Sequence, residues 1–374
     1  MERRLVERRL NWQQKCEEVG FSFYDIEGTY WHEGVCYCFT AAEIDELEEA
    51  TETLQQMCLE LVERVIAKSL FSQLDIPPQF AQLCQQSWQR KDRSLYGRFD
   101  LAYDGKHPPK LLEYNADTPT ALLESSVVQW AWLEEMFPEA DQFNSLHEKL
   151  LAQFESLHPT REKTFYFACE ANTDEDVGTV EYLRDLAIQA QFKTQHIFID
   201  EIGWDAETEK FCDLQNQPIE LLFKLYPWEW MIQEDFGQYL LKEPQSIFEP
   251  PWKMILSNKG ILPLLWEMFP NHKYLLPSYF DSAHLEPPYI SKPLFSREGE
   301  NITIYRNEGY RQMPNTTPQE TLIFQDYYPL PNFTNYYPVI GSWIVGEEAA
   351  GIGIREDRSI ITQDSSLFVP HLFY

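Results

Sequence analysis

One stretch, residues 94–120, constrains the fold more than any other because it combines a hairpin pattern with a concentrated set of polar side chains. Alternating polar and apolar residues predict one strand over 96–103 and a second over 110–115. Asp104 and Gly105 favour a turn between these strands, since glycine tolerates a positive φ. The sequence therefore predicts a β-hairpin with a slightly long loop.

Four polar side chains of this hairpin are expected to converge. Because side chains alternate faces along a strand, Arg98 and Asp100 share one face, and Glu113 and Asn115 share a face of the second strand. Two carboxylates and a carboxamide are the oxygen ligands that suit Mg²⁺, which usually keeps waters and binds through substrate phosphates. An arginine beside them suggests a phosphate group. The alternative is a solvated hairpin with a surface Arg–Asp pair, and the presence of all four groups favours the metal site.

Composition indicates a folded enzyme-sized chain. Its 374 residues are enough for one large unit or two to three sub-domains, and a hydrophobic content of 44% rules out a disordered chain. No stretch reaches the roughly 18 consecutive apolar residues that a membrane-spanning helix needs. The first ten residues lack the apolar centre of a signal peptide. Seven scattered cysteines fit a reducing compartment, so we expect a cytoplasmic protein.

The charge balance narrows the class of partner. A formal net charge of −30, from 60 acidic and 30 basic residues, argues against nucleic acid and membranes, which attract positive potential. It favours a cationic partner such as a polyamine-like amine, although an acidic composition can also serve solubility alone.

The cluster of His32, Cys36 and Cys38 is a weak candidate for a zinc site, because it lacks a fourth ligand. A strand that carries both cysteines on one face accounts for their spacing without a metal. Nothing in the sequence indicates the oligomeric state.

Several elements outside the hairpin carry clear local signals. Two small strands are expected within 21–39, and a capping box of Thr40 and Glu43 predicts a long amphipathic helix. Ser145 and Glu148 predict a second capped helix. The following pattern predicts an α/β sub-domain, with three acids in the loop 173–176 at the carboxyl end of a strand, where ligands usually bind. Further helices are expected over 79–90 and 121–137, and sub-domain elements over 163–170, 177–192, 194–200 and 220–225.

The last third of the chain has features of a phosphate site. Ser257 or Asn258 is expected to cap a helix with Lys259 in its first turn, which is unfavourable for the helix dipole unless an anion lies nearby. Lys292 ends a predicted strand, and Gly299 lies in the loop that leads to the next strand. A lysine can follow phosphate oxygens, and glycine allows close backbone approach. Further strands are expected over 301–305, 321–325, 341–345 and 349–355.

The sequence RFD at 98–100, followed by LLEYNADTPT at 111–120, resembles the metal-binding hairpin of the glutathionylspermidine synthase family. The resemblance runs over residues 11–374 and is strongest to the family's stand-alone acid–amine ligases. It implies an α/β (α+β) ATP-grasp fold of the glutathione synthetase type. Within that unit it implies a hairpin and acid-substrate portion at 11–144, an additional α/β substrate sub-domain at 145–250, and a nucleotide-binding portion at 251–374.

The resemblance also implies a reaction, the formation of an amide bond from an acid and an amine through an acyl phosphate, with ATP cleaved to ADP and phosphate. The acid would be glutathione or another peptide or amino acid, and the amine a primary amine or polyamine. Leu225 replaces the threonine that holds glutathione in family members that use it, which weakens the expectation of glutathione. Two alternatives stay open: an ATP-binding pseudo-ligase with a regulatory role, and an ATP-grasp kinase without an amine step.

The resemblance implies binding residues for the metal, for ATP and for the two substrates. The expected cofactor is Mg²⁺, as two ions, held by Asp100, Glu113 and Asn115. Arg98 and Arg355 match the two catalytic arginines. The positions that match contacts of ATP are Arg98, Lys259, Lys292, Glu298, Gly299, Gln325 and Ile360. The positions that match substrate contacts are Thr118 and Thr120 for the acid, and Glu175 and Asp176 for the amine or the amino group of glutathione.

Overall fold

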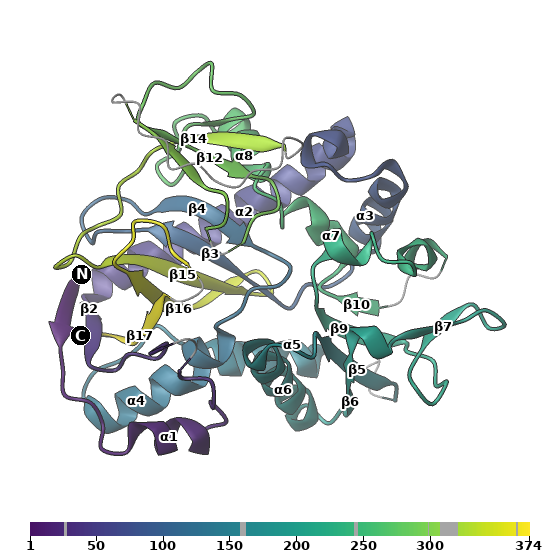
Figure 1. Cartoon of the computed structure of the whole chain (residues 1–374), viewed down its shortest axis with the longest axis horizontal. Helices are drawn as coiled ribbons and strands as arrows, with labels where there is room; N and C mark the ends of the chain where they lie inside the picture. The colour runs from purple at the N-terminus through teal and green to yellow at the C-terminus, as the bar shows by residue number, and fades with distance from the viewer. Residues whose placement is uncertain (26–27, 158–161, 243–245, 298, 307–320, 364–365) are drawn as a thin grey trace.

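The computed structural model describes the whole chain except residues 26–27, 158–161, 243–245, 298, 307–320 and 364–365. A five-stranded antiparallel sheet lies at its centre, with strand order β17-β16-β15-β3-β4. The hairpin of β3 and β4 therefore pairs with strands from the end of the chain (Figure 1). The strands are β3 (Tyr96–Ala102), β4 (Lys110–Asn115), β15 (Tyr337–Val345), β16 (Glu348–Asp357) and β17 (Leu367–Val369).

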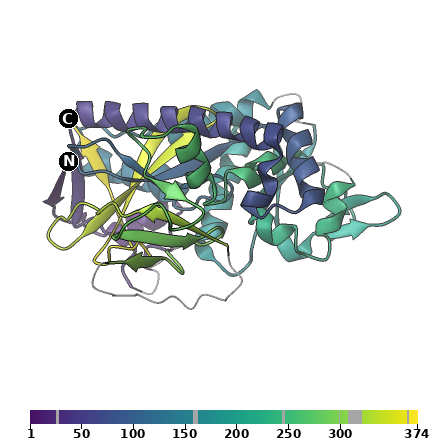
Figure 2. The same cartoon turned by 90° about the horizontal axis from the view of Figure 1, so that it is seen from above.

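The long helix α2 (Ala41–Lys68) packs on the central sheet against β15 and β16, and Figure 2 shows it along one side of the molecule. Its capping box is confirmed, because Thr40 Oγ1 accepts the Glu43 N–H at 3.3 Å and the Thr40 N–H donates to Glu43 Oε2 at 2.8 Å. An apolar stripe that includes Leu47, Leu54 and Leu61 is fully buried. The predicted amphipathic pattern therefore positions the sheet that carries the hairpin.

A parallel sheet of order β10-β9-β5-β6 forms the α/β sub-domain. Figure 1 shows α5 (Leu146–Ser156) and α6 (Asp174–Gln189) beside it, and Phe165, Phe167 and Phe223 are buried in the same core cluster as residues of both helices. Also in this region are β7 (Gly203–Asp205), β8 (Lys210–Cys212), α7 (Trp228–Met231) and η5 (Gly237–Leu241). The parallel strands are β5 (Thr164–Cys169), β6 (Lys193–Phe198), β9 (Leu221–Leu225) and β10 (Ser246–Phe248).

A third sheet, of order β11-β14-β12-β13, lies above the hairpin in the view of Figure 1. All its described pairings are antiparallel, and α8 (Ile261–Met268) packs against β11 and β14. Lys292 of β12 thus faces the central sheet region, where its amino group meets the Leu112 carbonyl of the β4 strand. The strands are β11 (Ser278–Tyr279), β12 (Tyr289–Pro293), β13 (Thr303–Tyr305) and β14 (Leu322–Asp326).

The two ends of the chain meet in a small sheet of order β1-β2-β18. β2 (Val35–Phe39) pairs with β1 (Glu2–Leu5) on one side and with β18 (His371–Phe373) on the other. Arg3 pairs with the buried Glu356 carboxylate at 2.7 Å, which ties this sheet to β16. The remaining helical segments are α1 (Trp12–Glu18), η1 (Leu70–Leu74), α3 (Pro78–Arg90), η2 (Glu124–Val128), α4 (Gln129–Met136), η4 (Ile199–Glu201) and η6 (Pro251–Ile255).

Four local predictions differ from the structure. Among the described residues of 21–39, β2 is the one strand that forms, because the preceding aromatic residues pack edge to face in a loop, as Phe21 and Phe23 do at 4.5 Å between ring centroids. Ser145 does not cap α5, since its hydroxyl donates to the Ala350 carbonyl at 3.1 Å instead. Helix α8 begins at Ile261, so Lys259 precedes it rather than lying in its first turn. The helix expected over 121–137 contains the π-helical segment η2 before α4. None of the described helices is both long and apolar enough to cross a bilayer.

Candidate active site

The hairpin brings its four polar side chains together, as the strand pattern predicts. Arg98 lies opposite Asn115, and Asp100 lies opposite Glu113. The Arg98 guanidinium donates to both Asp100 oxygens, at 2.7 and 3.1 Å, and to the Thr120 carbonyl at 2.7 Å. On the adjacent strand β15, a Cβ at Gly341 would lie 2.8 Å from Arg98 Cδ, so this glycine leaves room for the arginine. The guanidinium is therefore held in one orientation.

Asn115 lies between the two carboxylates. Its side-chain nitrogen donates to Asp100 Oδ2 at 3.1 Å and to Glu113 Oε1 at 3.3 Å. Rotation of this amide by 180° would place its oxygen, rather than its nitrogen, between the two carboxylates. The amide oxygen could then serve as a metal ligand, since the two amide orientations have nearly the same shape. Two carboxylates and one amide fit Mg²⁺ that is held mainly through substrate phosphates and water, rather than a closed cage of protein ligands. Among the described residues, no group of three or more His, Cys, Asp or Glu could hold a metal ion.

Positive side chains balance these carboxylates. Lys259 Nζ lies 2.9 Å from Glu113 Oε2, and Lys292 Nζ donates to the Leu112 carbonyl and to Gln325 Oε1, each at 2.9 Å. Burial opposes the ionisation of Glu113, but Lys259 and Lys292 outweigh it and lower its pKa to about 2. Burial also lowers the pKa of Lys292 to about 8, which a nearby anion would reverse. The site therefore offers both fixed negative charge and cations suited to phosphate.

Most of the site residues predicted from the sequence line two adjoining cavities. The larger, of about 580 Å³, we call the active-site cavity, and the smaller, of about 110 Å³, the apolar cavity. Both are lined by Asp100, Glu113 and Gly299, so they meet at the hairpin. The predicted residues that line the active-site cavity are Arg98, Asp100, Glu113, Asn115, Thr118, Thr120, Glu175, Asp176, Gly299 and Arg355. Those that line the apolar cavity are Asp100, Glu113, Lys292, Gly299, Gln325 and Ile360.

Two predicted residues are placed differently. Lys259 lines a separate hollow beside Glu113 and reaches the site through its ion pair with that carboxylate. Glu298 lies outside the described residues. Its neighbour Gly299 has a φ of 69°, and a Cβ there would lie 2.4 Å from Ile361 Cγ2. This position therefore requires glycine, because the loop packs closely against 361–362.

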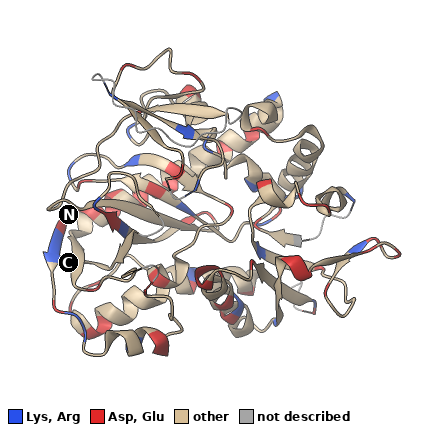
Figure 3. Cartoon of the chain, viewed as in Figure 1, with Lys and Arg blue, Asp and Glu red and all other residues tan. Residues whose placement is uncertain are grey.

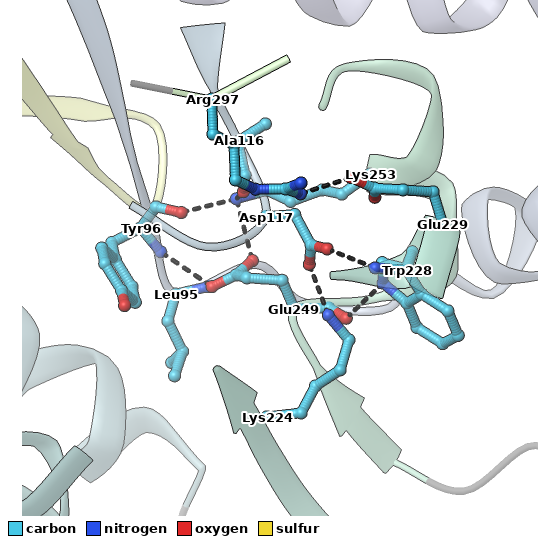
Figure 4. Close-up of polar contacts among 10 residues, drawn as sticks. All are labelled: Leu95, Tyr96, Ala116, Asp117, Lys224, Trp228, Glu229, Glu249, Lys253 and Arg297. Carbon is cyan, nitrogen blue, oxygen red and sulfur yellow. Dashed lines mark hydrogen bonds and ion pairs between the residues drawn. The ribbon is translucent and has the colours of Figure 1, made fainter. Parts of the chain in front are cut away.

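Arg297 is a further residue of the candidate site that was not predicted from the sequence. Arg297 lines the active-site cavity, pairs with Glu229 of α7, and lies 4.9 Å from the ring centroid of Trp230. It thus links the loop after β12 to the α/β sub-domain (Figure 4). Sequence reasoning missed this contact because 68 residues separate the two charges and neither belongs to a local motif.

A buried polar network fixes the ends of the hairpin strands (Figure 4). Just after β4, Asp117 accepts from Lys224 Nζ at 2.5 Å and from the Trp228 N–H at 2.9 Å. Just before and within β3, the Leu95 and Tyr96 N–H groups donate to Glu249, whose carboxylate pairs with Lys253 at 2.8 Å. These four charged side chains are at most 2% exposed: Asp117, Lys224, Glu249 and Lys253. The network therefore joins the hairpin to β9 and to η6.

We predict that Lys224→Met lowers the free energy of unfolding by about 3–5 kcal/mol, because it leaves the Asp117 carboxylate buried without its cation. Urea unfolding monitored by tryptophan fluorescence measures this change. Lys163→Met is the matched control, since Lys163 is half exposed and lies 3.8 Å from Glu220. Equal effects of the two substitutions would contradict the structural role of the pair.

Glu124 is a second buried group that the sequence did not reveal. It lies in η2, is fully buried, and accepts a hydrogen bond from Tyr30 Oη at 2.6 Å through Oε1. Its Oε2 has no hydrogen-bond partner among the described residues. Burial, reinforced by the charge of Glu175, raises the pKa of Glu124 to about 8. The folded protein therefore keeps a proton here that the unfolded chain releases near pH 4.5.

This shift predicts a pH-dependent stability. Because the folded state holds the extra proton between about pH 4.5 and 8, the free energy of unfolding contributed by Glu124 falls as the pH rises through that window. Glu124→Gln keeps an acceptor for Tyr30 but carries no charge. We expect its stability relative to the unsubstituted protein to rise from pH 5 to pH 8, by on the order of 3 kcal/mol.

Urea unfolding at both pH values measures the difference. Glu155→Gln, on the exposed part of α5, is the control and should give the same relative stability at pH 5 and pH 8. A relative stability of Glu124→Gln that does not change with pH would show that Glu124 ionises normally in the folded protein.

Residues 3–374 match the family described as glutathionylspermidine synthase preATP-grasp. A Haemophilus influenzae protein provisionally named an acid–amine ligase is 40% identical over 378 residues, covering 96% of each chain. The bifunctional glutathionylspermidine synthetase/amidase of Escherichia coli is 26% identical over 89% of this chain and 58% of its own length. A glutathione synthetase-like effector from Globodera pallida shares the fold, with a TM-score of 0.61, 11% identity and 98% coverage of both chains.

The chain therefore belongs to the glutathionylspermidine synthase family. Its structure is a mixed α/β fold of the glutathione synthetase-like ATP-grasp type, which confirms the fold predicted from the sequence. It is an ATP-dependent carbon–nitrogen ligase, as the relatives named as ligases and synthetases indicate. The roles of the individual site residues stay predictions.

Proposed function

We propose that this enzyme joins a small carboxylic acid or peptide to a primary amine, with ATP cleaved to ADP and phosphate. The observation that carries this proposal is the convergence of Arg98, Asp100, Glu113 and Asn115 at the junction of two cavities. One cavity is small and apolar, which suits an adenine ring. The other is large and polar, which suits the triphosphate and the two substrates that must meet.

The nucleotide is proposed to lie with its base in the apolar cavity. Ile290, Ile302 and Ile304 supply apolar walls, and Gln325 supplies an amide for the base edge. Lys292 and Lys259 are proposed to contact the phosphates, because each can exchange its present oxygen partner for a phosphate oxygen. Gly299 would let the covering loop approach the triphosphate closely.

In the first step, an oxygen of the substrate carboxylate attacks the γ-phosphorus, the bond to the β-phosphate oxygen breaks, and ADP leaves. Arg98 and Arg355 are proposed to stabilise the charge that develops on the transferred group. Asp100, Glu113 and Asn115 would hold Mg²⁺, as two ions, which would supply positive charge beside the triphosphate. The Arg98 guanidinium needs little reorganisation, because Asp100 and Thr120 already fix its orientation.

In the second step, the ammonium ion of the amine first releases one proton to solvent, which frees the lone pair of its nitrogen. The nitrogen then attacks the acyl carbon, the bond from that carbon to the phosphate oxygen breaks, phosphate leaves, and the nitrogen releases a second proton to solvent. Glu175 and Asp176 line the active-site cavity at the start of α6 and are proposed to attract the amine as its ammonium ion. Thr118 and Thr120 are proposed to contact the acid. Leu225 lines the same cavity and offers no hydrogen bond, so glutathione would lose the contact that a threonine provides there.

The three portions of the chain then take separate roles. Residues 11–144 are proposed to carry the metal hairpin and acid contacts, residues 145–250 the amine-binding sub-domain, and residues 251–374 the nucleotide contacts. The pairing of β15 with β3 supports this arrangement, because it places the nucleotide portion directly against the hairpin.

We predict that Glu113→Gln lowers kcat/KM by about 10²-fold or more, because it removes one negative charge from a site for a divalent cation. Steady-state ADP release measures the change. Glu49→Gln is the matched control, since Glu49 is an exposed carboxylate of α2 paired with Lys273. Full turnover of Glu113→Gln at saturating ATP and ordinary magnesium would contradict the metal assignment.

The products released from ATP test the proposed reaction. With a correct pair of substrates, we expect ADP and inorganic phosphate, rather than AMP and pyrophosphate, and release only when both acid and amine are present. The physical reason is that the cationic groups surround the hairpin, where charge develops at the γ-phosphorus. Mass spectrometry of paired acids and amines, starting with glutathione and spermidine, measures this. AMP formation would overturn the mechanism, and ADP release without amine would favour the kinase alternative.

A further inference from the structure

A second large cavity, of about 450 Å³, lies within the α/β sub-domain, and none of the residues that line it has a role in the proposed function. We call it the sub-domain cavity. Its size falls within the roughly 300–1,000 Å³ typical of small-molecule sites. Leu222 of β9, Ile247 of β10, Leu240 of η5 and Phe211 of β8 form buried apolar walls. A ligand with an apolar body would therefore bind favourably, because it would displace water from these apolar walls.

Carboxylates line the same cavity. Glu170 follows β5, Asp200 lies two residues after β6, and Glu234 and Asp235 lie between α7 and η5. Tyr226 Oη donates to Glu234 Oε1 at 2.5 Å, which fixes that carboxylate. None of the described residues that line the cavity is a lysine or arginine. The cavity therefore favours ammonium groups and disfavours carboxylates and phosphates.

Its position also points to a ligand. The residues that follow β5, β6 and β9 all line it, so the cavity opens at the carboxyl edge of a parallel sheet, where ligands of open α/β sheets bind. Glu170 and Asn172 line both this cavity and the active-site cavity. The two cavities therefore adjoin at these two residues, and a chain held at Glu175 and Asp176 would have to pass Glu170 to reach the sub-domain cavity.

We propose that the sub-domain cavity binds the far end of the amine substrate, and that this substrate is a long diamine charged only at its ends. This inference rests on the proposed function for the reacting end of the amine. The apolar walls enclose the methylene chain, and the second ammonium pairs with Asp200, Glu234 or Asp235. A charge in the part of the chain that lies beyond Glu170 would be placed against Leu222 and Ile247, where its desolvation weakens binding.

Direct binding tests the inference without turnover. The probes are 1,8-diaminooctane, 1,4-diaminobutane, 1-octylamine and spermidine, each titrated into the full chain by calorimetry. Each buried methylene is expected to tighten binding by up to about fourfold. We therefore expect 1,8-diaminooctane to bind at least about tenfold more tightly than 1,4-diaminobutane, and more tightly than both 1-octylamine and spermidine. Equal affinities of the two diamines would overturn the proposal.

Two substitutions locate the binding. Ala171 is exposed and lines the sub-domain cavity, so Ala171→Phe should narrow it and remove the preference for the longer diamine. Ala206→Phe, at an exposed alanine outside the cavity lining, should keep that preference. Asp235→Asn should weaken 1,8-diaminooctane more than 1-octylamine, whereas Glu155→Gln should affect neither. An unchanged preference in Ala171→Phe would place the binding elsewhere.

The outcomes also separate this inference from the ligase proposal. If the longer diamine binds through Ala171 and Asp235 but no acid yields amine-dependent ADP release, the ligase proposal fails and the cavity assignment stands. If amine-dependent ADP release occurs with a rate that is independent of chain length and of Ala171→Phe, the ligase proposal stands and the cavity assignment fails.

Discussion

The buried ion pairs at the ends of the hairpin strands fix the relative positions of the three main parts of the structure. A charge in the protein interior costs several kcal/mol unless it is paired and hydrogen-bonded. Asp117 and Glu249 each combine a lysine with backbone N–H groups, so both carboxylates are satisfied only when β3, β4, β9 and η6 are all in place. Small displacements would leave charges unpaired. Separate segments of the chain form the walls of the active-site cavity, and the buried ion pairs keep these segments in fixed relative positions.

The charges of the candidate site differ from these buried pairs, because they line cavities where a ligand could replace their present partners. Asp100 pairs with Arg98, and Glu113 pairs with Lys259, within one connected group of side chains. The same carboxylates suit a metal ion, and the same cations suit phosphate oxygens. A ligand that brings both kinds of charge can replace these internal pairs with external ones. Such a site stays electrostatically balanced whether its groups meet each other or the ligand.

The parts of this arrangement that sequence reasoning predicted depend on local rules. Alternation along β3 and β4 was enough to place Arg98 with Asp100 and Glu113 with Asn115 on one face of each strand, and the capping box was enough to start α2. The register of the two strands then brings these faces together. The resemblance to a family supplied the positions that lie far apart in the chain. The π-helical turn with Glu124, the pair of Arg297 with Glu229 and the sub-domain cavity could not be predicted. Each arises from packing between distant segments, which leaves no periodic signal in the sequence.

The central sheet joins strands made early and late in synthesis, since β3 near residue 100 pairs with β15 near residue 340. On the ribosome, the β3 edge has no partner until most of the chain has emerged. An open edge that carries Phe99 and Leu101, both fully buried in the folded protein, is a template for pairing with other chains. The sheet around the hairpin can thus be completed only when β15 has been made, and a chain that ends before β15 would expose an unpaired edge. We therefore expect chains truncated before β15 to aggregate more readily than the full chain.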